Sequence, residues 1–134
     1  MKATILSIIV AVTLIAGALL LVRGGNTVTS GQVATNANNV SVIDGKQIIE
    51  ITARGGYQPR KSIAKAGIPT VIRFNTNGTF DCSSYVRIPS MNISKALPQT
   101  GSTDIDIGVG KVGKLSGTCG MGMYPFEVEF TVSL

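Results

Sequence analysis

The chain has 134 residues and a formal net charge of +5, with 12 Lys and Arg against 7 Asp and Glu and no histidine. This length suits a single folded domain, and the absence of histidine excludes His-based catalytic triads and the common His-containing metal sites. The cations are scattered and Trp is absent, so we expect no nucleic-acid surface, which would combine a basic patch with stacking aromatic side chains.

The chain begins with an uncharged apolar run at residues 3–22, between Lys2 and Arg23. About 20 apolar residues are enough to span the hydrocarbon core of a bilayer. A cleavable signal peptide usually has a shorter apolar stretch followed by a small-x-small site, whereas the Ala-Gly-Ala pattern at 16–18 lies inside the run. We therefore predict residues 1–24 to be a transmembrane helix retained as a membrane anchor, with a removed signal segment as the alternative.

Residues 25–46 are rich in Asn, Thr, Ser and Gly and have little apolar periodicity. Such a composition predicts a flexible linker that holds a folded part away from the membrane. We expect that folded part to lie outside the cytoplasm, on the cell surface or in the periplasm. The domain is then 47–134, which is long enough for only a modest core. A metal ion or a disulfide would add stability to a core of this size.

Apolar and polar residues alternate with a period of two through most of the predicted domain. Each alternating stretch fits a strand with one buried and one solvated face. Turn signals of Gly, Pro and Asn separate the stretches, and no window shows a sustained helical period, so we predict an all-β sandwich or barrel. The stretches are 47–53, 68–76, 84–88, 103–108 and 126–132.

Three sulfur side chains, Cys119, Met121 and Met123, occupy alternate positions in the stretch SGTCGMGMYPFEVEF. In a straight strand the first and last Cα atoms would lie about 13 Å apart, too far to share one small ion. Gly120 and Gly122 remove this obstacle because glycine adopts positive φ and lets the chain bend tightly. The sequence therefore predicts a loop at a strand end, in which the sulfurs can converge.

Cys82 is the other cysteine of the chain and could complete a sulfur site from a neighbouring loop. Thiolate and thioether donors select Cu(I), and by extension Ag(I), over harder ions. The alternative is a structural disulfide between Cys82 and Cys119, which would close a loop of about 36 residues and contribute about 3–4 kcal/mol. Both interpretations remain open from these residues, and Met91 is assigned to packing.

Motifs that would suggest an enzyme are weak, and we expect no enzymatic activity. The acids in DID at 104–106 alternate with Ile and fit the solvated face of a strand. The run GVGKVGK at 108–114 is similar to a phosphate-binding loop but lacks the helix that such a loop opens. Ser83 and Ser84 have no base to activate them.

Three segments of the chain, taken in order, resemble a cupredoxin-like domain. They are GGYQPRKSIAKAGIPTVIRF at 55–74, CSSYVRIPSMNISKALP at 82–98 and GKLSGTCGMGMYPFEVEF at 113–130. The resemblance is to the plastocyanin-like branch found in bacterial copper-handling proteins. It implies a Greek-key β-sandwich with copper bound at one end.

The resemblance also implies a ligand set. Cys82 and Cys119 would be thiolate ligands of copper, most simply Cu(I), and Met121 or Met123 would supply a thioether. Cys82 stands where ordinary cupredoxins place their first histidine, so a blue Cu(II) centre is not expected. Pro125 stands where this branch commonly has a glycine, and it would stiffen the loop.

These features together predict a membrane-tethered, extracytoplasmic Cu(I)-binding protein for copper delivery, buffering or resistance. Its partners would be the copper ion, the membrane, and a copper transporter or copper acceptor protein. One alternative is an electron-transfer cupredoxin with altered ligation, which would need a stable Cu(II) state. The other is an interaction module held together by a disulfide and without a metal.

Overall fold

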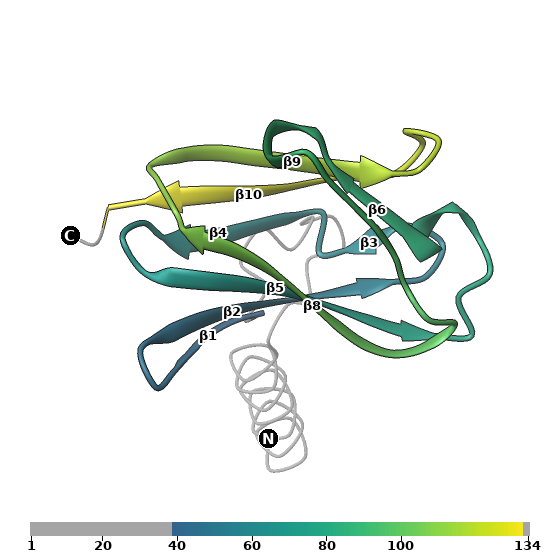
Figure 1. The fold of residues 1–134 in the computed structure, drawn as a ribbon, viewed down its shortest axis with the longest axis horizontal. Coiled ribbons are helices and arrows are strands. Elements are labelled where there is room, and N and C mark those ends of the chain that lie inside the picture. The colour runs from purple at the N-terminus through teal and green to yellow at the C-terminus, as the bar shows by residue number, and fades with distance from the viewer. Residues whose placement is uncertain (1–38, 133–134) are drawn as a thin grey trace, which may run out of the picture. The chain divides into compact units, whose positions relative to one another are not determined.

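The structure is a computed structural model that describes residues 39–132, which form ten strands and two 3₁₀ turns (Figure 1). The strands are β1 (Val40–Ile43), β2 (Lys46–Ala53), β3 (Tyr57–Gln58), β4 (Lys61–Lys65), β5 (Pro69–Asn77), β6 (Tyr85–Ile88), β7 (Ile93–Ala96), β8 (Thr100–Val109), β9 (Gly113–Cys119) and β10 (Pro125–Thr131). The turns are η1 (Cys82–Ser84) and η2 (Pro89–Met91).

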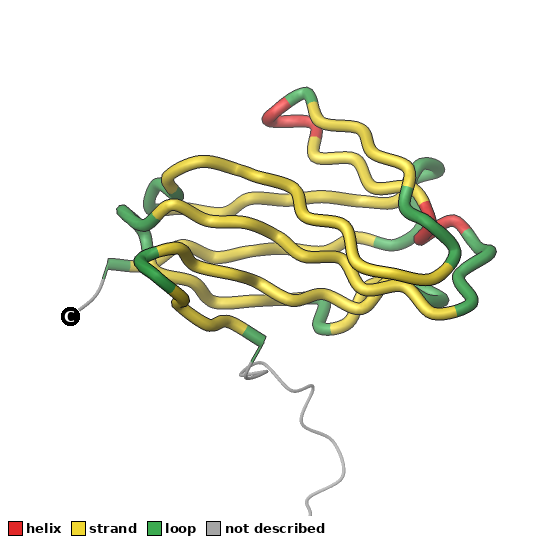
Figure 2. The backbone as a smooth tube through the Cα atoms, turned by 60° about the horizontal axis from the view of Figure 1, so that its bottom comes forward, coloured by secondary structure: helices red, strands yellow, loops and turns green. Residues whose placement is uncertain are grey.

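The strands form two five-stranded sheets that face each other as two layers (Figure 2). The first sheet has the order β1-β2-β5-β8 with β3 paired to β2, and the second has the order β4-β10-β9-β6-β7. The predicted all-β sandwich is confirmed. Two pairs, β2 with β5 and β4 with β10, are parallel, because the chain changes sheet between β3 and β5 instead of returning as a hairpin.

The core lies between the sheets and consists of the apolar faces that the period-two alternation predicts. In β2 the buried apolar side chains are Ile49, Ile51 and Ala53, while Glu50 and Thr52 face solvent. Burial of this apolar surface is the main term that stabilises the sandwich, at about 25 cal/mol for each Å² removed from water.

Three aromatic rings connect the two sheets within the core. Tyr57 of β3, Phe74 of β5 and Phe126 of β10 pack edge to face, with centroid separations of 5.7 Å, 5.0 Å and 5.4 Å. This geometry places the positive edge of one ring against the negative face of the next. The cluster therefore fixes how the end of the sandwich that carries η1 is packed.

The first sheet begins earlier than the sequence indicated. β1 pairs with β2 from Val40 to Ile43, inside the range 25–46 that was predicted as a linker. Its side chains are mostly exposed, so it shows no buried period that alternation could reveal. Within the described range no helix is long and apolar enough to cross a membrane, and the predicted anchor at 1–24 lies outside that range.

Among the residues that the structure describes, all strand pairings and the core cluster fall within 40–131. A segment that contains its own core and closes its own sheets can fold without the rest of the chain. The domain can therefore be produced for solution measurements without the predicted anchor.

Candidate metal centre

The two cysteines meet at one end of the sandwich. Cys82 opens η1, and Cys119 ends β9, opposite Val86 of β6. Their Cα atoms are 5.6 Å apart, and the two sulfurs form a disulfide across 37 positions of sequence. Cys119 is fully buried and Cys82 partly so. Of the two interpretations that the sequence left open, the structure realises the disulfide.

The loop between β9 and β10 bends as its glycines predict. The Gly122 N–H donates to the carbonyl of Cys119 at 2.9 Å, and the Cys119 N–H donates to the carbonyl of Tyr124 at 3.1 Å. Gly122 supplies the positive φ, at +75°. Gly120 has a different role, because a Cβ there would lie 3.2 Å from the ring of Tyr85.

The methionines of this loop lie at the surface beside the disulfide. The Met121 N–H donates to Sγ of Cys82 at 3.3 Å, which fixes the loop over η1. The side chains of Met121 and Met123 are 76% and 60% exposed, so neither packs in the core. Met91, by contrast, belongs to η2 and lines a cleft elsewhere. The structure thus brings the four predicted site residues into one end region, with the two cysteine sulfurs bonded to each other and the two methionines exposed.

Asp81 positions the cysteine turn and was not singled out from the sequence. Its carboxylate accepts hydrogen bonds from the N–H and the hydroxyl of Ser83, and from the Gly55 N–H at 2.8 Å. These bonds, the Ser83 hydroxyl first, lower the pKa of Asp81 below its ordinary value. An Asp directly before the Cys-Ser-Ser run could have been recognised as an N-cap. Its link to Gly55 could not, because Gly55 lies 26 residues away.

Tyr57 contacts the end of the sandwich that carries the cysteine pair. Its ring is buried, and its hydroxyl donates to the carbonyl of Tyr85 at 3.1 Å, at the start of β6. Burial, and secondarily the negative charge of Asp81, raises the pKa of Tyr57 well above its ordinary value. The phenol is therefore neutral at physiological pH and remains a hydrogen-bond donor.

The raised pKa of Tyr57 makes stability depend on alkaline pH. Because the unfolded chain loses this proton at about pH 10 and the folded chain holds it longer, the free energy of unfolding should fall as pH rises above about 10. Urea denaturation from about pH 8 to about pH 11 measures this fall. Tyr57→Phe should show a smaller fall, and Tyr85→Phe, which removes an exposed phenol, is the matched control. Equal falls in Tyr57→Phe and the unmodified protein would contradict the assignment.

The donors at this end of the molecule are sulfur. Within residues 39–132 no three His, Cys, Asp or Glu side chains gather as they would around a harder ion. The carboxylate oxygens of Asp81, which directly precedes Cys82, accept hydrogen bonds from backbone N–H groups and the Ser83 hydroxyl. Sulfur donors suit a soft metal ion once the disulfide is opened, whereas calcium and magnesium prefer oxygen ligands.

The fold and the site define a small β-sandwich domain with a cysteine pair and a methionine loop at one end. A family model described as "Cupredoxin-like domain" matches residues 14–132. The chain therefore belongs to the cupredoxin-like domain family.

Among the solved structures that share the fold, two are similar over most of their own length. One is the metal-binding domain of the Cu(I)-exporting P-type ATPase CopA of Streptococcus pneumoniae D39, determined with Cu(I); it is 24% identical with a TM-score of 0.62, covering 69% of this chain and 92% of that domain. The other is a copper binding protein in the apo form, 24% identical with a TM-score of 0.63, covering 69% of this chain and 94% of that one. A search of curated proteins finds no match.

Proposed function

We propose that this protein is a membrane-tethered, extracytoplasmic Cu(I)-binding protein that serves copper delivery, buffering or resistance. One observation carries the proposal. Cys82 and Cys119 meet beneath an exposed loop that bears Met121 and Met123, in a chain without histidine. Thiolates and thioethers are the donors that Cu(I) prefers.

Copper binding requires the dithiol form of this site. Two electrons from a dithiol reductant break the sulfur–sulfur bond and give two thiols, while the reductant becomes a disulfide. Each thiol then loses its proton on metal binding, since the thiolate is the ligand. Cu(I) arrives as cargo and is held by the two thiolates together with Met121 or Met123.

The comparisons support this assignment. The CopA domain with the same fold was determined with Cu(I), and the second neighbour is described as a copper binding protein. The two exposed methionines suit cargo transfer, because a flexible thioether at the surface can be exchanged for a donor of a copper transporter or acceptor protein.

The sequence and the disulfide support the proposed location. The apolar run at 3–22 is long enough to anchor the domain in a bilayer. Disulfides persist outside the cytoplasm and are rare inside it, so Cys82–Cys119 favours a domain on the outer side of the membrane. In this location the resting protein would carry the disulfide, and the disulfide would be reduced before copper binds.

Competition with a chromophoric Cu(I) chelator tests the proposal. We expect the anaerobically reduced domain to hold Cu(I) and to protect both thiols from alkylation, and the oxidised domain to bind far more weakly. Replacing Met121 and Met123 together by Leu should weaken Cu(I) binding by about tenfold or more. Removing a residue that only hydrogen-bonds to a metal ligand already lowers metal affinity by about that factor. Met91→Leu removes a thioether outside the site and is the matched control.

Two outcomes would overturn the proposal. If the reduced domain leaves both thiols open to alkylation in the presence of Cu(I), the site is not a copper site. The disulfide itself favours the second candidate, a stapled interaction module, and this result would select it. An intense thiolate-to-copper absorption on oxidation would instead favour electron transfer.

A further inference from the structure

A cleft of about 460 Å³ opens beside the connection between β8 and β9, away from the cysteine pair. Gly113 lines it and begins β9, whereas Cys119 ends the same strand. At about 3.3 Å for each residue, the two places are about 20 Å apart. The cleft is therefore not part of the proposed copper site.

The cleft exists because β6 leaves β9 early. These strands pair only at Val86 with Cys119 and at Arg87 with Thr118. The chain then turns through η2, where Asn92 takes a left-handed conformation, and the first half of β9 has no strand on that side. The opening between η2 and the β8–β9 connection is the cleft.

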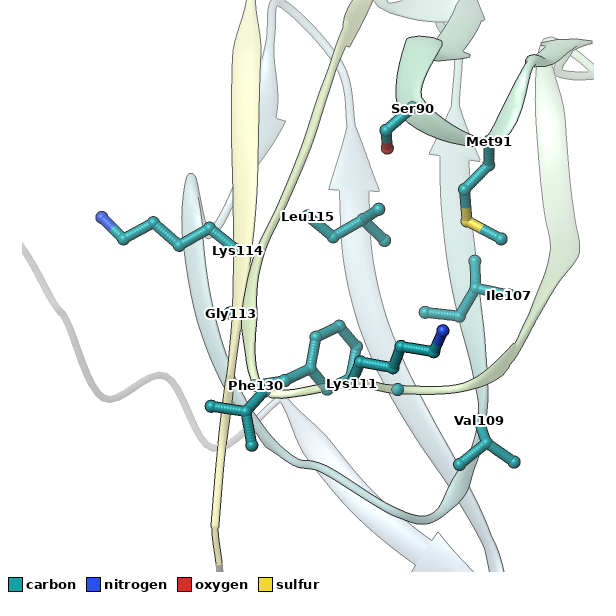
Figure 3. Close-up of a pocket in the computed structure, with 11 residues that line it drawn as sticks. Ser90, Met91, Ile107, Val109, Lys111, Gly113, Lys114, Leu115 and Phe130 are labelled. Carbon is teal, nitrogen blue, oxygen red and sulfur yellow. The ribbon is translucent and has the colours of Figure 1, made fainter.

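Its floor is apolar and is shaped by one glycine. The buried ring of Phe130 lies against the backbone of Gly110, where an added Cβ would overlap the ring. Ile107 and Leu115 form the walls, and Met91 of η2 points toward Ile107 (Figure 3). An alkyl chain placed here would contact aliphatic and aromatic side chains along its length.

One cation stands over this apolar surface. Figure 3 shows Lys111 extending across the cleft. The lining contains no acidic residue. Lys114, the second lining lysine, pairs with Glu127 at 3.4 Å, whereas no ion pair of Lys111 is found among the described residues. The Lys111 ammonium is thus available to an anion from outside.

We infer that this cleft binds a single-chain amphiphile with an anionic head group, of the medium-chain carboxylate class. The alkyl chain lies between Met91 and Phe130, and the carboxylate pairs with the ammonium of Lys111. The volume falls within the roughly 300–1,000 Å³ typical of small-molecule sites. The inference does not depend on copper binding.

Amide chemical shifts of the oxidised domain, produced from residue 25 onward, test the inference with decanoate as the probe. We expect saturable shifts confined to residues 107–115, 130 and η2. Decyltrimethylammonium has the same chain and the opposite charge, and it should bind more weakly. Equal shifts with both amphiphiles, or none with decanoate, would overturn the inference.

Two variants separate the chain from the head group. Lys111→Gln keeps most of the stem and should weaken decanoate binding about three- to fivefold, the effect of one partly exposed ion pair. Lys65→Gln makes the same charge change outside the cleft and should leave binding unchanged. Ser90 lines the cleft with its side chain directed into it (Figure 3). Ser90→Trp should therefore fill the opening with a ring and abolish the saturable shifts.

Sedimentation with vesicles of anionic phospholipid tests whether the domain binds a lipid surface instead. If the domain sediments with such vesicles but shows no shift with decanoate, its lysines bind a lipid surface and the cleft is not an amphiphile site. If Lys111→Gln and Lys65→Gln weaken decanoate binding equally, general charge attraction explains the binding and the specific role of Lys111 is wrong.

Discussion

Reducing the Cys82–Cys119 disulfide is expected to lower the free energy of unfolding by about 3–4 kcal/mol. The bond links residues 37 positions apart, and opening it restores chain entropy to the unfolded state. This is a large share of the total for a domain of this size, since folded proteins are stable by only about 5–15 kcal/mol. Urea denaturation with and without a reductant measures the difference on one and the same sequence.

A variant without the two thiols is the control. Cys82→Ala combined with Cys119→Ala should be as sensitive to urea with reductant as without it. Cu(I) bound only by the folded, reduced protein should return part of the lost stability, because a ligand of the native state stabilises it by mass action. Equal unfolding midpoints for the oxidised and reduced protein would show that the disulfide does not constrain the chain.

Gly117→Ala is expected to lower the free energy of unfolding by about 1–3 kcal/mol, the range measured for overpacked cores. A Cβ at residue 117 would overlap the ring of Phe126. That ring cannot withdraw, because Tyr57 and Phe74 hold it edge to face with centroids 5.0 Å and 5.4 Å away. Urea or thermal unfolding of the oxidised domain measures the cost.

Two further variants make the Gly117 prediction specific. Ser116→Ala changes the exposed neighbour on the same strand and should alter stability by less than about 0.5 kcal/mol. Adding Phe126→Leu to Gly117→Ala should cost less than the sum of the two single changes, because the smaller side chain removes the overlap. Additive costs would contradict the proposed clash.

The two sulfur states offer alternative ways of joining the same two elements. In the oxidised protein the disulfide holds η1 to the end of β9. In the proposed loaded state, a copper ion would hold the same two residues through its thiolate bonds. The intermediate dithiol has neither link, and we expect it to be the least stable and the most mobile form.

Local pattern was sufficient for five of the strands that carry the core, but it missed β3 and β4, which contribute Tyr57 and Ala64. β2, β5, β6, β8 and β10 all lie where alternation predicted a strand, because a buried face recurs at every second residue whatever the partner. β1 was not predicted, because its side chains are mostly exposed and show no buried face at alternate positions. The parallel pairs could not be derived in the same way, since strand direction depends on where the chain crosses between sheets.

The sequence by itself determined the chemistry of this protein. It contains sulfur donors and no imidazole, and glycines where the donor loop must bend. Donor type and backbone freedom are properties of single residues, so no fold is needed to read them. The resemblance carried by three segments extended this to the family.

The tertiary structure decided how those donors are arranged. It joined Cys82 to Cys119, left Met121 and Met123 at the surface, and tied Asp81 to Gly55. It also opened the cleft under Lys111 by ending the pairing of β6 with β9 after two positions. Each of these contacts joins residues far apart in the chain, and their distance is set by strand register and sheet packing, which local sequence does not encode.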